Sequence, residues 1–539
     1  MKKILLTSIL GLCICFSALA QSAEMSTSQK LRYAAGIIEA YYVDTVNSEK
    51  LADEAIIAML KTLDPHSSYS TPEETQELNE PLQGKFSGIG ITFNMQNDTL
   101  YVLQTVVNGP CEKVGIVPGD RIISANDTVI SGVKMKNKDV IKLLRGPKGS
   151  VVNIKVKRKG KAELLSFRVV REDIPIYSID AAYMADKTTG YIRISRFAED
   201  TNEEFLTAVK DLKKQGMKNL IVDLQDNGGG YLGTAYQLAS NFLNNRELVV
   251  YTEGLNVQPY YYYTEGNGSL RDCRLIILTN QYSASASEIV AGAIQDNDRG
   301  LIVGRRTFGK GLVQRPFPFP DGSMIRLTIS RYHTPSGRCI QKPYTLGDEE
   351  GYREDMSNRY EGGELMNEDS VHFADSLQYT TLKNERVVYG GGGIMPDKFV
   401  PIDTTGYTDY YRQMVGSGNL HKYCLQYVDK NREELKKKYP TDDDFVKKFK
   451  VTDKMFDEII KMCEDDSIKF NEAEFKISKE LIGSVMKANI ASDIYGSKSF
   501  YKVINETDEI YKAALDLINN EEEYNRLLQE GNVKAGSIN

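Results

Sequence analysis

Three serines alternate with alanines where the sequence predicts a junction between a buried strand and a helix. Ser283, Ser285 and Ser287 follow the apolar run RLIILTN and precede the helical pattern ASEIVAGAIQD. Backbone N–H groups at a helix N-terminus lack intrahelical acceptors and favour negative charge, which suits the oxyanion formed in acyl transfer. Serine is also a frequent helix N-cap, so capping and packing by small residues is the simpler interpretation. The serines alone leave both interpretations open.

A lysine further along the chain could supply the base that a serine nucleophile needs. Lys310 lies in the segment TFGKG, after the predicted strand GLIVGRR, and no histidine lies near the serines in sequence. Burial would lower the pKa of this lysine, so that its neutral amine could accept a proton near neutral pH. Gln314, four residues further on, could orient the amine. A solvated surface lysine is the alternative.

A glycine-rich turn is the third candidate element. Gly228 and Gly229 lie in DLQDNGGG, between the buried-strand run NLIVDL and a predicted helix. Such a turn can present backbone N–H donors, although a plain strand–helix connection has the same pattern. The segment Gly304–Lys310 also fits a phosphate-binding loop, but Gly311 replaces the required Ser or Thr, and prolines follow where a helix is needed. We therefore exclude nucleotide binding at that segment.

The elements that must position these residues differ in periodicity along the chain. Residues 27–80 have helical spacing, and residues 83–172 have short strands separated by Gly, Asn and Pro turns. Residues 173–402 alternate strand and helix, which predicts a mostly parallel sheet with helices packed on it. An acidic insertion, residues 344–385, interrupts this core, and we interpret it as a solvated surface segment, with a substrate-repelling or regulatory flap as the alternative. Residues 405–539 have helical spacing and predict a separate accessory helical region.

Several motifs together resemble the carboxyl-terminal processing protease family, also called tail-specific proteases. The segment LDPHSSY resembles the family's N-terminal signature, and FSGIGI, PGDRI and LLRGPKG resemble its PDZ domain. The core motifs follow in the family's order: DLQDNGGG, SASASEI, TFGKGLVQ, RYHTPSGRCIQ and GGGIMPD. The resemblance covers roughly residues 30–400. It implies a multidomain α/β fold, with a PDZ domain, a crotonase/Clp-protease-like α/β core, an N-terminal helical region and a C-terminal helical extension.

The same resemblance assigns the catalytic residues. Ser285 is implied as the nucleophile and Lys310 as the base of a Ser/Lys dyad, while Gln314 orients the lysine. Asp296 aligns with an acidic position that matters in some members, or it caps the end of its helix. The resemblance also implies the oxyanion donors, and the choice of glycine stays open: Ala286, with Gly228 or Gly229.

The PDZ resemblance implies how substrates are selected. A PDZ domain adds an extended C-terminal peptide to a strand edge and holds the peptide carboxylate with backbone N–H groups. Arg145, in LLRG, resembles a family arginine that couples tail binding to the protease core, although an exposed surface arginine would look the same. The residues implied to bind the tail are Ser87, Gly88, Ile89, Gly90 and Ile91.

Composition and the N-terminus limit the class of protein. The 539 residues include 67 basic and 74 acidic side chains, a net charge of −7, so the basic excess of a nucleic-acid binder is missing. There is no HExxH or paired CxxC motif, and we expect neither a metal nor a cofactor. Residues 1–20 have the pattern of a signal peptide, with Lys2 and Lys3 before an apolar run and Ala18-Leu19-Ala20 at its end. We expect cleavage after Ala20 and export across the inner membrane to the periplasm.

Together these features predict a secreted serine endopeptidase that binds protein C-termini through its PDZ domain. The expected partners are proteins or peptides with free C-terminal tails. Membrane-associated substrates and an oligomeric assembly are both compatible with the sequence. The alternative function is a non-catalytic PDZ tail receptor or scaffold on a protease-like core. A Ser/Lys amidase for small molecules is disfavoured because a PDZ domain recognises peptides.

Overall fold

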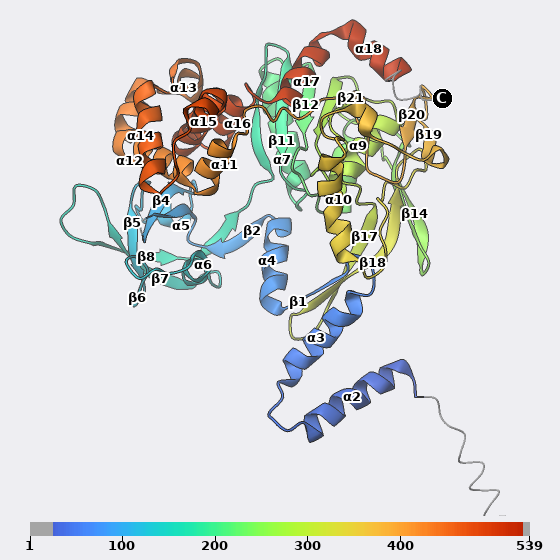
Figure 1. The fold of residues 1–539 in the computed structure, drawn as a ribbon, viewed down its shortest axis with the longest axis horizontal. Coiled ribbons are helices and arrows are strands. Elements are labelled where there is room, and N and C mark those ends of the chain that lie inside the picture. The colour runs from blue at the N-terminus through green and yellow to red at the C-terminus, as the bar shows by residue number, and fades with distance from the viewer. Residues whose placement is uncertain (1–24, 97, 532–539) are drawn as a thin grey trace, which may run out of the picture.

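A six-stranded sheet carries the candidate catalytic residues in a computed structural model that describes residues 25–96 and 98–531 (Figure 1). β10 and β11 are antiparallel, and the other neighbouring strands are parallel. This confirms the predicted, mostly parallel sheet. In spatial order the strands are β10 (Ile179–Met184), β11 (Thr189–Ile194), β12 (Asn219–Asp223), β15 (Arg274–Thr279), β16 (Leu301–Gly304) and β21 (Lys398–Phe399).

Helices cover both faces of this sheet, which explains why its strands are apolar on both sides. Val222 and Ile277 pack against helices on one face, while their neighbours Ile221 and Ile276 pack against helices on the other. The first face is covered by α7 (Thr201–Lys214), α8 (Leu232–Ser240) and α9 (Ala286–Asp296). The second is covered by α17 (Glu509–Asn519) and α18 (Glu521–Glu530). The last two helices of the chain therefore pack on the protease sheet.

A second, antiparallel sheet joins the N-terminal region to the core. Its strands follow the order β1, β18, β13 and β14, and β17 also pairs with β18. Because β1 pairs with β18, the LDPHSSY segment lies beside the strands that follow Lys310. The strands are β1 (Ser68–Ser70), β13 (Leu248–Gly254), β14 (Val257–Tyr263), β17 (Leu312–Pro318) and β18 (Met324–His333).

The region expected to be a PDZ domain has its own sheet and its own apolar core. β3 is the edge strand of that sheet, so one side of it is open to a further strand. The sheet consists of β3 (Ile91–Gln96), β4 (Thr99–Thr105), β5 (Arg121–Ala125), β6 (Thr128–Val129), β7 (Val151–Lys157) and β8 (Leu165–Val170). Its helices are α5 (Pro110–Lys113) and α6 (Asn137–Leu144). A separate ladder of β2 (Lys85–Gly88) and β9 (Glu172–Pro175) connects it to the core.

Two N-terminal helices, α2 (Thr27–Tyr41) and α3 (Ser48–Leu60), form the arm at the bottom of Figure 1, and no residue of α2 is buried. The third, α4 (Pro72–Gln83), lies higher in the picture, next to β2. The insertion contains α10 (Glu349–Glu361), two single-turn 3₁₀ helices (Glu368–Ser370 and Asp375–Leu377) and β19 (Gln378–Thr380), which pairs with β20 (Val387–Tyr389) just after the insertion. The predicted signal peptide, residues 1–20, lies outside the described residues.

Most of the C-terminal region folds around its own apolar core and lies beside the PDZ region (Figure 1). Gln104 Nε2 donates to Ser492 O at 2.9 Å, and Arg121 pairs with Asp429 at 3.5 Å across this contact. Its helices are α11 (Asp409–Gly416), α12 (Asn419–Lys438), α13 (Asp442–Lys448), α14 (Asp453–Asp465), α15 (Glu472–Tyr495) and α16 (Ser497–Ile504). Among residues 25–96 and 98–531, no helix has the length and apolarity to cross a membrane.

Candidate active site

Ser285 stands immediately before α9 in a backbone conformation that non-glycine residues rarely adopt. Its φ is 57° and its ψ is −113°, so the chain turns sharply between the loop after β15 and the helix. Every residue of α9 is buried, so the apolar helix fixes this turn in the core. A strained residue held by a rigid surrounding is typical of a functional position.

Of the three serines, only the middle one keeps its hydroxyl proton uncommitted. Ser283 Oγ donates to Leu224 O at 2.7 Å, and Ser287 Oγ donates to Asn227 O at 2.8 Å. Both of these residues are fully buried. Ser285 Oγ donates no hydrogen bond to any residue in the described part of the chain; it forms a capping box with the N–H of Glu288, and the residue is partly exposed. The flanking serines hold neighbouring loops, whereas Ser285 Oγ is available for chemistry.

Glu288, which the sequence analysis did not single out, connects the serine to the lysine. Its carboxylate is fully buried and accepts four hydrogen bonds. Oε2 accepts the N–H groups of Ser285 and Lys310, each at 2.8 Å. Oε1 accepts Thr307 Oγ1 at 2.5 Å and Gly309 N at 2.7 Å. The available signal was the Ser-x-x-Glu spacing, which is the pattern of a helix capping box.

Tyr332, on β18, ties the same two segments together a second time. Its hydroxyl lies 3.1 Å from Ser285 O and 2.7 Å from Lys310 O, and the side chain is almost fully buried. Glu288 accepts the backbone N–H groups of Ser285 and Lys310, and the Tyr332 hydroxyl contacts their backbone carbonyl oxygens. Together they fix both backbones. This arrangement brings the predicted pair into one site, although no hydrogen bond joins Ser285 Oγ directly to Lys310 Nζ among the described residues. Catalytic hydrogen bonds are often looser without substrate.

Lys310 is in an environment that disfavours its charge. Burial, together with the positive charge of Arg326, lowers the pKa of Lys310 to about 8. Its Nζ donates to Gln314 Oε1 at 3.0 Å, as the sequence analysis expected of an orienting glutamine. Gln314 Nε2 in turn donates to the carbonyl oxygen of His66. The amine is thus held by a side chain that is itself anchored to the N-terminal region.

The LDPHSSY segment provides that anchor. Asp64 accepts the N–H of His66 at 3.0 Å and the hydroxyl of Thr328, on β18, at 2.8 Å. The His66 ring lies 2.9 Å from the hydroxyl of Tyr352, on α10. Burial and the charge of Lys310 lower the pKa of His66 to about 4, so this ring stays neutral near neutral pH. The motif acts on the site through the backbone carbonyl of His66.

The acidic insertion is not simply a solvated surface segment, so that expectation is wrong for its helix. Tyr352 and Arg359, both on α10, are buried. Arg359 donates to Thr307 O at 3.1 Å and to Arg306 O at 2.8 Å. The charged sequence hid this packing because most of α10 faces solvent and only one side of it, with Tyr352 and Arg359, is buried. The helix braces the loop that leads to Lys310.

The glycine turn, residues 225–230, lies against the serine. A Cβ on Gly229, whose φ is +102°, would stand 2.8 Å from Ser285 Cβ and 3.0 Å from Ala286 N. The Gly229 N–H donates to Asn227 Oδ1 at 2.8 Å, whereas the Gly228 N–H has no acceptor in the described residues. Ala286 is the first residue of α9, so its N–H has no intrahelical acceptor. The geometry favours Gly228 over Gly229 as an available donor.

Asp296 lies at the far end of α9 from Ser285. The helix has 11 residues, which corresponds to about 16 Å at 1.5 Å per residue. Its carboxylate accepts Arg338 at 2.6 Å and the N–H of Ser336 at 3.0 Å, and it is fully buried. Asp296 therefore holds the helix end rather than contacting the dyad residues.

The predicted tail-binding residues lie where β2 passes into the edge strand β3. Gly90 has a φ of +71°, and a Cβ there would meet Ile174 at 3.1 Å and Pro110 at 3.2 Å, so only glycine fits. Ser87 Oγ donates to Asp173 at 3.1 Å on the neighbouring strand β9. The other residues of the predicted set, which follow Ser87 along the chain, are Gly88, Ile89, Gly90 and Ile91.

Arg145 is not a free surface arginine. Its guanidinium donates to Glu80, on α4, and lies 4.2 Å from the centre of the Phe86 ring, on β2. It therefore connects the PDZ region to the helix that follows β1. No cluster of three or more His, Cys, Asp or Glu side chains in the described ranges is arranged to hold a metal ion.

Comparisons with known proteins agree with this architecture. The family model "Peptidase family S41" matches residues 188–350, and "PDZ domain" matches residues 87–169. "Activating protease CtpB N-terminal domain" matches residues 16–75. Residues 410–496 match a family of unknown function, DUF8443. The predicted multidomain α/β fold with a PDZ domain is thereby confirmed.

Curated relatives carry protease names. The carboxy-terminal processing protease CtpB of Bacillus subtilis (strain 168) is 35% identical over 339 residues, covering 60% of this chain and 68% of the relative. The carboxy-terminal-processing protease of Bartonella bacilliformis is 34% identical, covering 59% and 74%. Among solved structures, the photosystem II D1 C-terminal processing protease is 29% identical, covers 59% of this chain and 91% of its own, and gives a TM-score of 0.34.

Proposed function

Because the chain belongs to the carboxyl-terminal processing protease family and is a PDZ-containing serine-type peptidase, we propose that it cleaves peptide bonds with a Ser285/Lys310 dyad. One observation carries the proposal. The backbones of these two residues share a buried carboxylate, Glu288, and a buried hydroxyl, Tyr332. Within this frame the proton of the serine hydroxyl has no acceptor among the described residues, and the lysine is desolvated. A non-catalytic scaffold has no use for such a pair.

In the proposed reaction the neutral Nζ of Lys310 accepts the proton of Ser285 Oγ, and the oxygen attacks the scissile carbonyl carbon. The resulting oxyanion accepts the N–H groups of Ala286 and Gly228. Lys310 then gives its proton to the leaving amine, which leaves an acyl-enzyme. Lys310 then takes a proton from water, the water oxygen attacks the ester, and Lys310 returns the proton to Ser285 Oγ as the acyl group leaves as the new carboxylic acid, which ionises. Gln314 keeps the amine oriented throughout.

We further propose that free C-terminal tails bind at residues 87–91 and extend along β3. Strand addition to a PDZ edge satisfies the backbone of an extended peptide, and the turn at Gly90 offers N–H groups to its carboxylate. Arg145 then couples the binding of a tail to the protease core, because it contacts Glu80, which lies outside the PDZ region. The preference for tails rests on the PDZ match and on the open edge of β3.

The N-terminal pattern supports the further proposal that the protein is exported to the periplasm and cleaved after Ala20. Mass spectrometry of the mature protein would then find an N-terminus at Gln21. A mature chain that retains Met1 would contradict this proposal.

The dyad is tested by replacement and by labelling. Ser285→Ala and Lys310→Ala should each abolish cleavage of an unfolded protein with an apolar tail, while circular dichroism shows an unchanged fold. A fluorophosphonate should label the wild-type protein, and peptide mapping should place the adduct on Ser285 rather than Ser283 or Ser287. Cleavage by Ser285→Ala at the wild-type rate would overturn the assignment.

A further inference from the structure

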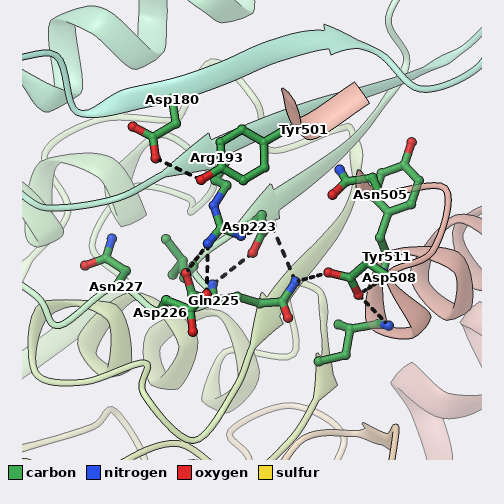
Figure 2. Close-up of polar contacts among 12 residues, drawn as sticks. Asp180, Arg193, Asp223, Gln225, Asp226, Asn227, Tyr501, Asn505, Asp508 and Tyr511 are labelled. Atoms are coloured by element: carbon green, nitrogen blue, oxygen red, sulfur yellow. Dashed lines mark hydrogen bonds and ion pairs between the residues drawn. The ribbon is translucent and has the colours of Figure 1, made fainter. Parts of the chain in front are cut away.

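A partly buried polar cluster joins the glycine turn to the C-terminal helices (Figure 2). The turn follows β12 on one side, and the connection between α16 and α17 lies on the other. The two segments are far apart in sequence: Gln225 and Asp508 are separated by 283 positions. Neither the family resemblance nor the family of unknown function assigns a role to this contact.

The two carboxylate oxygens of Asp508 have different partners. Oδ1 caps α17 by accepting the N–H groups of Ile510 at 2.8 Å and Tyr511 at 3.0 Å. Oδ2 accepts Gln225 Nε2 at 3.1 Å. Gln225 is the first residue of the glycine turn and is 5% exposed, so water cannot readily replace this partner. The start of α17 thereby fixes the start of the turn.

Arg193, on β11, fixes the next part of the turn. Its guanidinium donates to Gln225 O and to Asp226 Oδ2, each at 3.0 Å, and to the buried Asp223 at 2.7 Å. The guanidinium carbon, Cζ, lies 4.7 Å from the centre of the Tyr501 ring, on α16. Figure 2 shows Arg193 between these groups. Asp226 has a φ of 60°, a conformation that needs such support in a residue with a side chain.

Residues 227–229, which lie against Ser285, come next along the turn. Asn227 O accepts the N–H of Ala284, at 3.0 Å, and Asn227 Oδ1 accepts the N–H of Gly229, at 2.8 Å. Displacement of residues 225 and 226 would therefore move Asn227 and the N–H of Gly228. A buried polar group that loses its partner keeps the cost of its desolvation, so removing one of these contacts weakens the hold on the turn.

We propose that Asp508 and Tyr501 are positioning residues for peptide cleavage, which hold the glycine turn so that the Gly228 N–H can receive the oxyanion. The inference rests on the proposed function. It gives the end of the C-terminal region a role in turnover beyond packing on the sheet. Asp508 acts through Gln225, and Tyr501 acts through Arg193; neither contacts the substrate.

The main test compares two helix caps. Asp508→Ser keeps a good N-cap for α17, but serine is too short to reach Gln225. Asn520→Ser is the matched control, because Asn520 caps α18 on the same face of the sheet by accepting the N–H of Glu523 at 3.1 Å. Tyr501→Leu removes the ring beside Arg193, whereas Tyr501→Phe keeps it. For each full-length variant, kcat, KM and hydrogen exchange over residues 224–231 are measured.

We expect Asp508→Ser and Tyr501→Leu to lower kcat about tenfold or more, with KM within about twofold, because a misplaced donor affects the transition state. Amide exchange over residues 224–231 should accelerate in both variants. Asn520→Ser and Tyr501→Phe should match the wild type in both measurements. The acid limb of the pH profile should not move, since Lys310 is untouched. A wild-type kcat with unchanged exchange in Asp508→Ser, or an equal loss in Asn520→Ser, would overturn the inference.

Hydrogen exchange separates this inference from the dyad, because it requires no turnover. If Ser285→Ala still cleaves substrate, the dyad fails, and faster exchange in Asp508→Ser would still show that Asp508 holds the turn. If Ser285 is essential but Asp508→Ser changes neither kcat nor exchange, the dyad stands and the positioning role fails.

Discussion

At Lys310 the property that matters is a neutral form of the amine that is accessible near neutral pH. An exposed lysine has a pKa near 10.4 and is protonated in almost every molecule at pH 7. Burial and the neighbouring charge of Arg326 lower the pKa of Lys310 to about 8. A desolvated amine can then act as the base without a histidine, and the histidine beside it, His66, supplies only a backbone carbonyl.

The first prediction concerns pH. Only neutral Lys310 accepts a proton, so kcat/KM should rise with pH, pass its midpoint near the lysine pKa of about 8 and then level off. Arg326→Gln removes a charge that lowers this pKa, so the midpoint should move to higher pH. Steady-state rates of both proteins between pH 6 and 10 provide the measurement. An identical midpoint in the two proteins would count against Lys310 as the titrating base.

The second prediction concerns Glu288. In Glu288→Gln one carboxylate oxygen becomes an NH₂ group that faces two N–H or O–H donors, so buried donors lose their acceptor. We expect stability to fall by about 2–3 kcal/mol and kcat/KM by about 100-fold. Urea unfolding and peptide assays measure the two effects.

Glu204→Gln is the matched control for this variant. Glu204, on α7, accepts the N–H groups of Ser178 and Ile179, at 2.8 and 3.1 Å, away from the dyad. Both N–H groups bond to one oxygen, Oε2, so the amide oxygen of a glutamine can accept them, and this variant should keep both its stability and its activity. If both variants lost activity in proportion to stability, Glu288 would have no particular role in the site.

At the scale of elements, the site is built from the ends of strands. β12 and β15 are neighbours in the sheet, and the loops after them carry the glycine turn and Ser285. Because parallel strands end at the same edge, two loops far apart in sequence meet there. α9 begins directly after Ser285 and β17 begins two residues after Lys310, so these two elements fix the backbone positions of both residues.

The third prediction compares two neighbouring glycines of the turn. Gly229→Ala places a Cβ at 2.8 Å from Ser285 Cβ, in a backbone with a φ of +102°, and should lower kcat/KM about 100-fold. Gly228→Ala meets no atom within 4 Å and keeps its N–H, so activity should stay within about tenfold of the wild type. Steady-state kinetics with one peptide distinguishes them. A larger loss of kcat/KM in Gly228→Ala than in Gly229→Ala would show that the turn has another arrangement in the working enzyme.

At the scale of the whole molecule, three regions meet at the protease core. The N-terminal segment holds Gln314 through His66, and α10 of the insertion contacts the same histidine. Arg145 connects the PDZ domain to α4, and the C-terminal helices contact both the PDZ domain and the glycine turn. These contacts connect the proposed tail-binding residues to the proposed dyad through more than one element.

The fourth prediction is that a tail peptide activates cleavage. A peptide with a free carboxylate should raise the turnover of a short, tail-less substrate about fivefold or more, within the usual range of coupling between sites. The same peptide with an amidated C-terminus lacks the group that the PDZ turn holds and is the control. Equal stimulation by both peptides would contradict carboxylate recognition at residues 87–91.

The sequence determined much of this protein by itself. Apolar periodicity predicted the central sheet and α9, and the motifs identified the family, because strands, turns and glycine positions depend on neighbours along the chain. The Ser-x-x-Glu spacing was also present, but it did not show that Glu288 would contact the segment of Lys310. Nor did the charged composition of the insertion show that one side of α10 would be buried.

The tertiary structure alone decided which polar groups share a partner. It set the contact of Tyr332 with both Ser285 and Lys310, the contact of Gln314 with His66, and the contact of Gln225 with Asp508. It also placed the last two helices on the protease sheet. Such pairs join residues far apart in sequence, and they form because a polar group that folding removes from water must find a partner wherever the packed chain offers one.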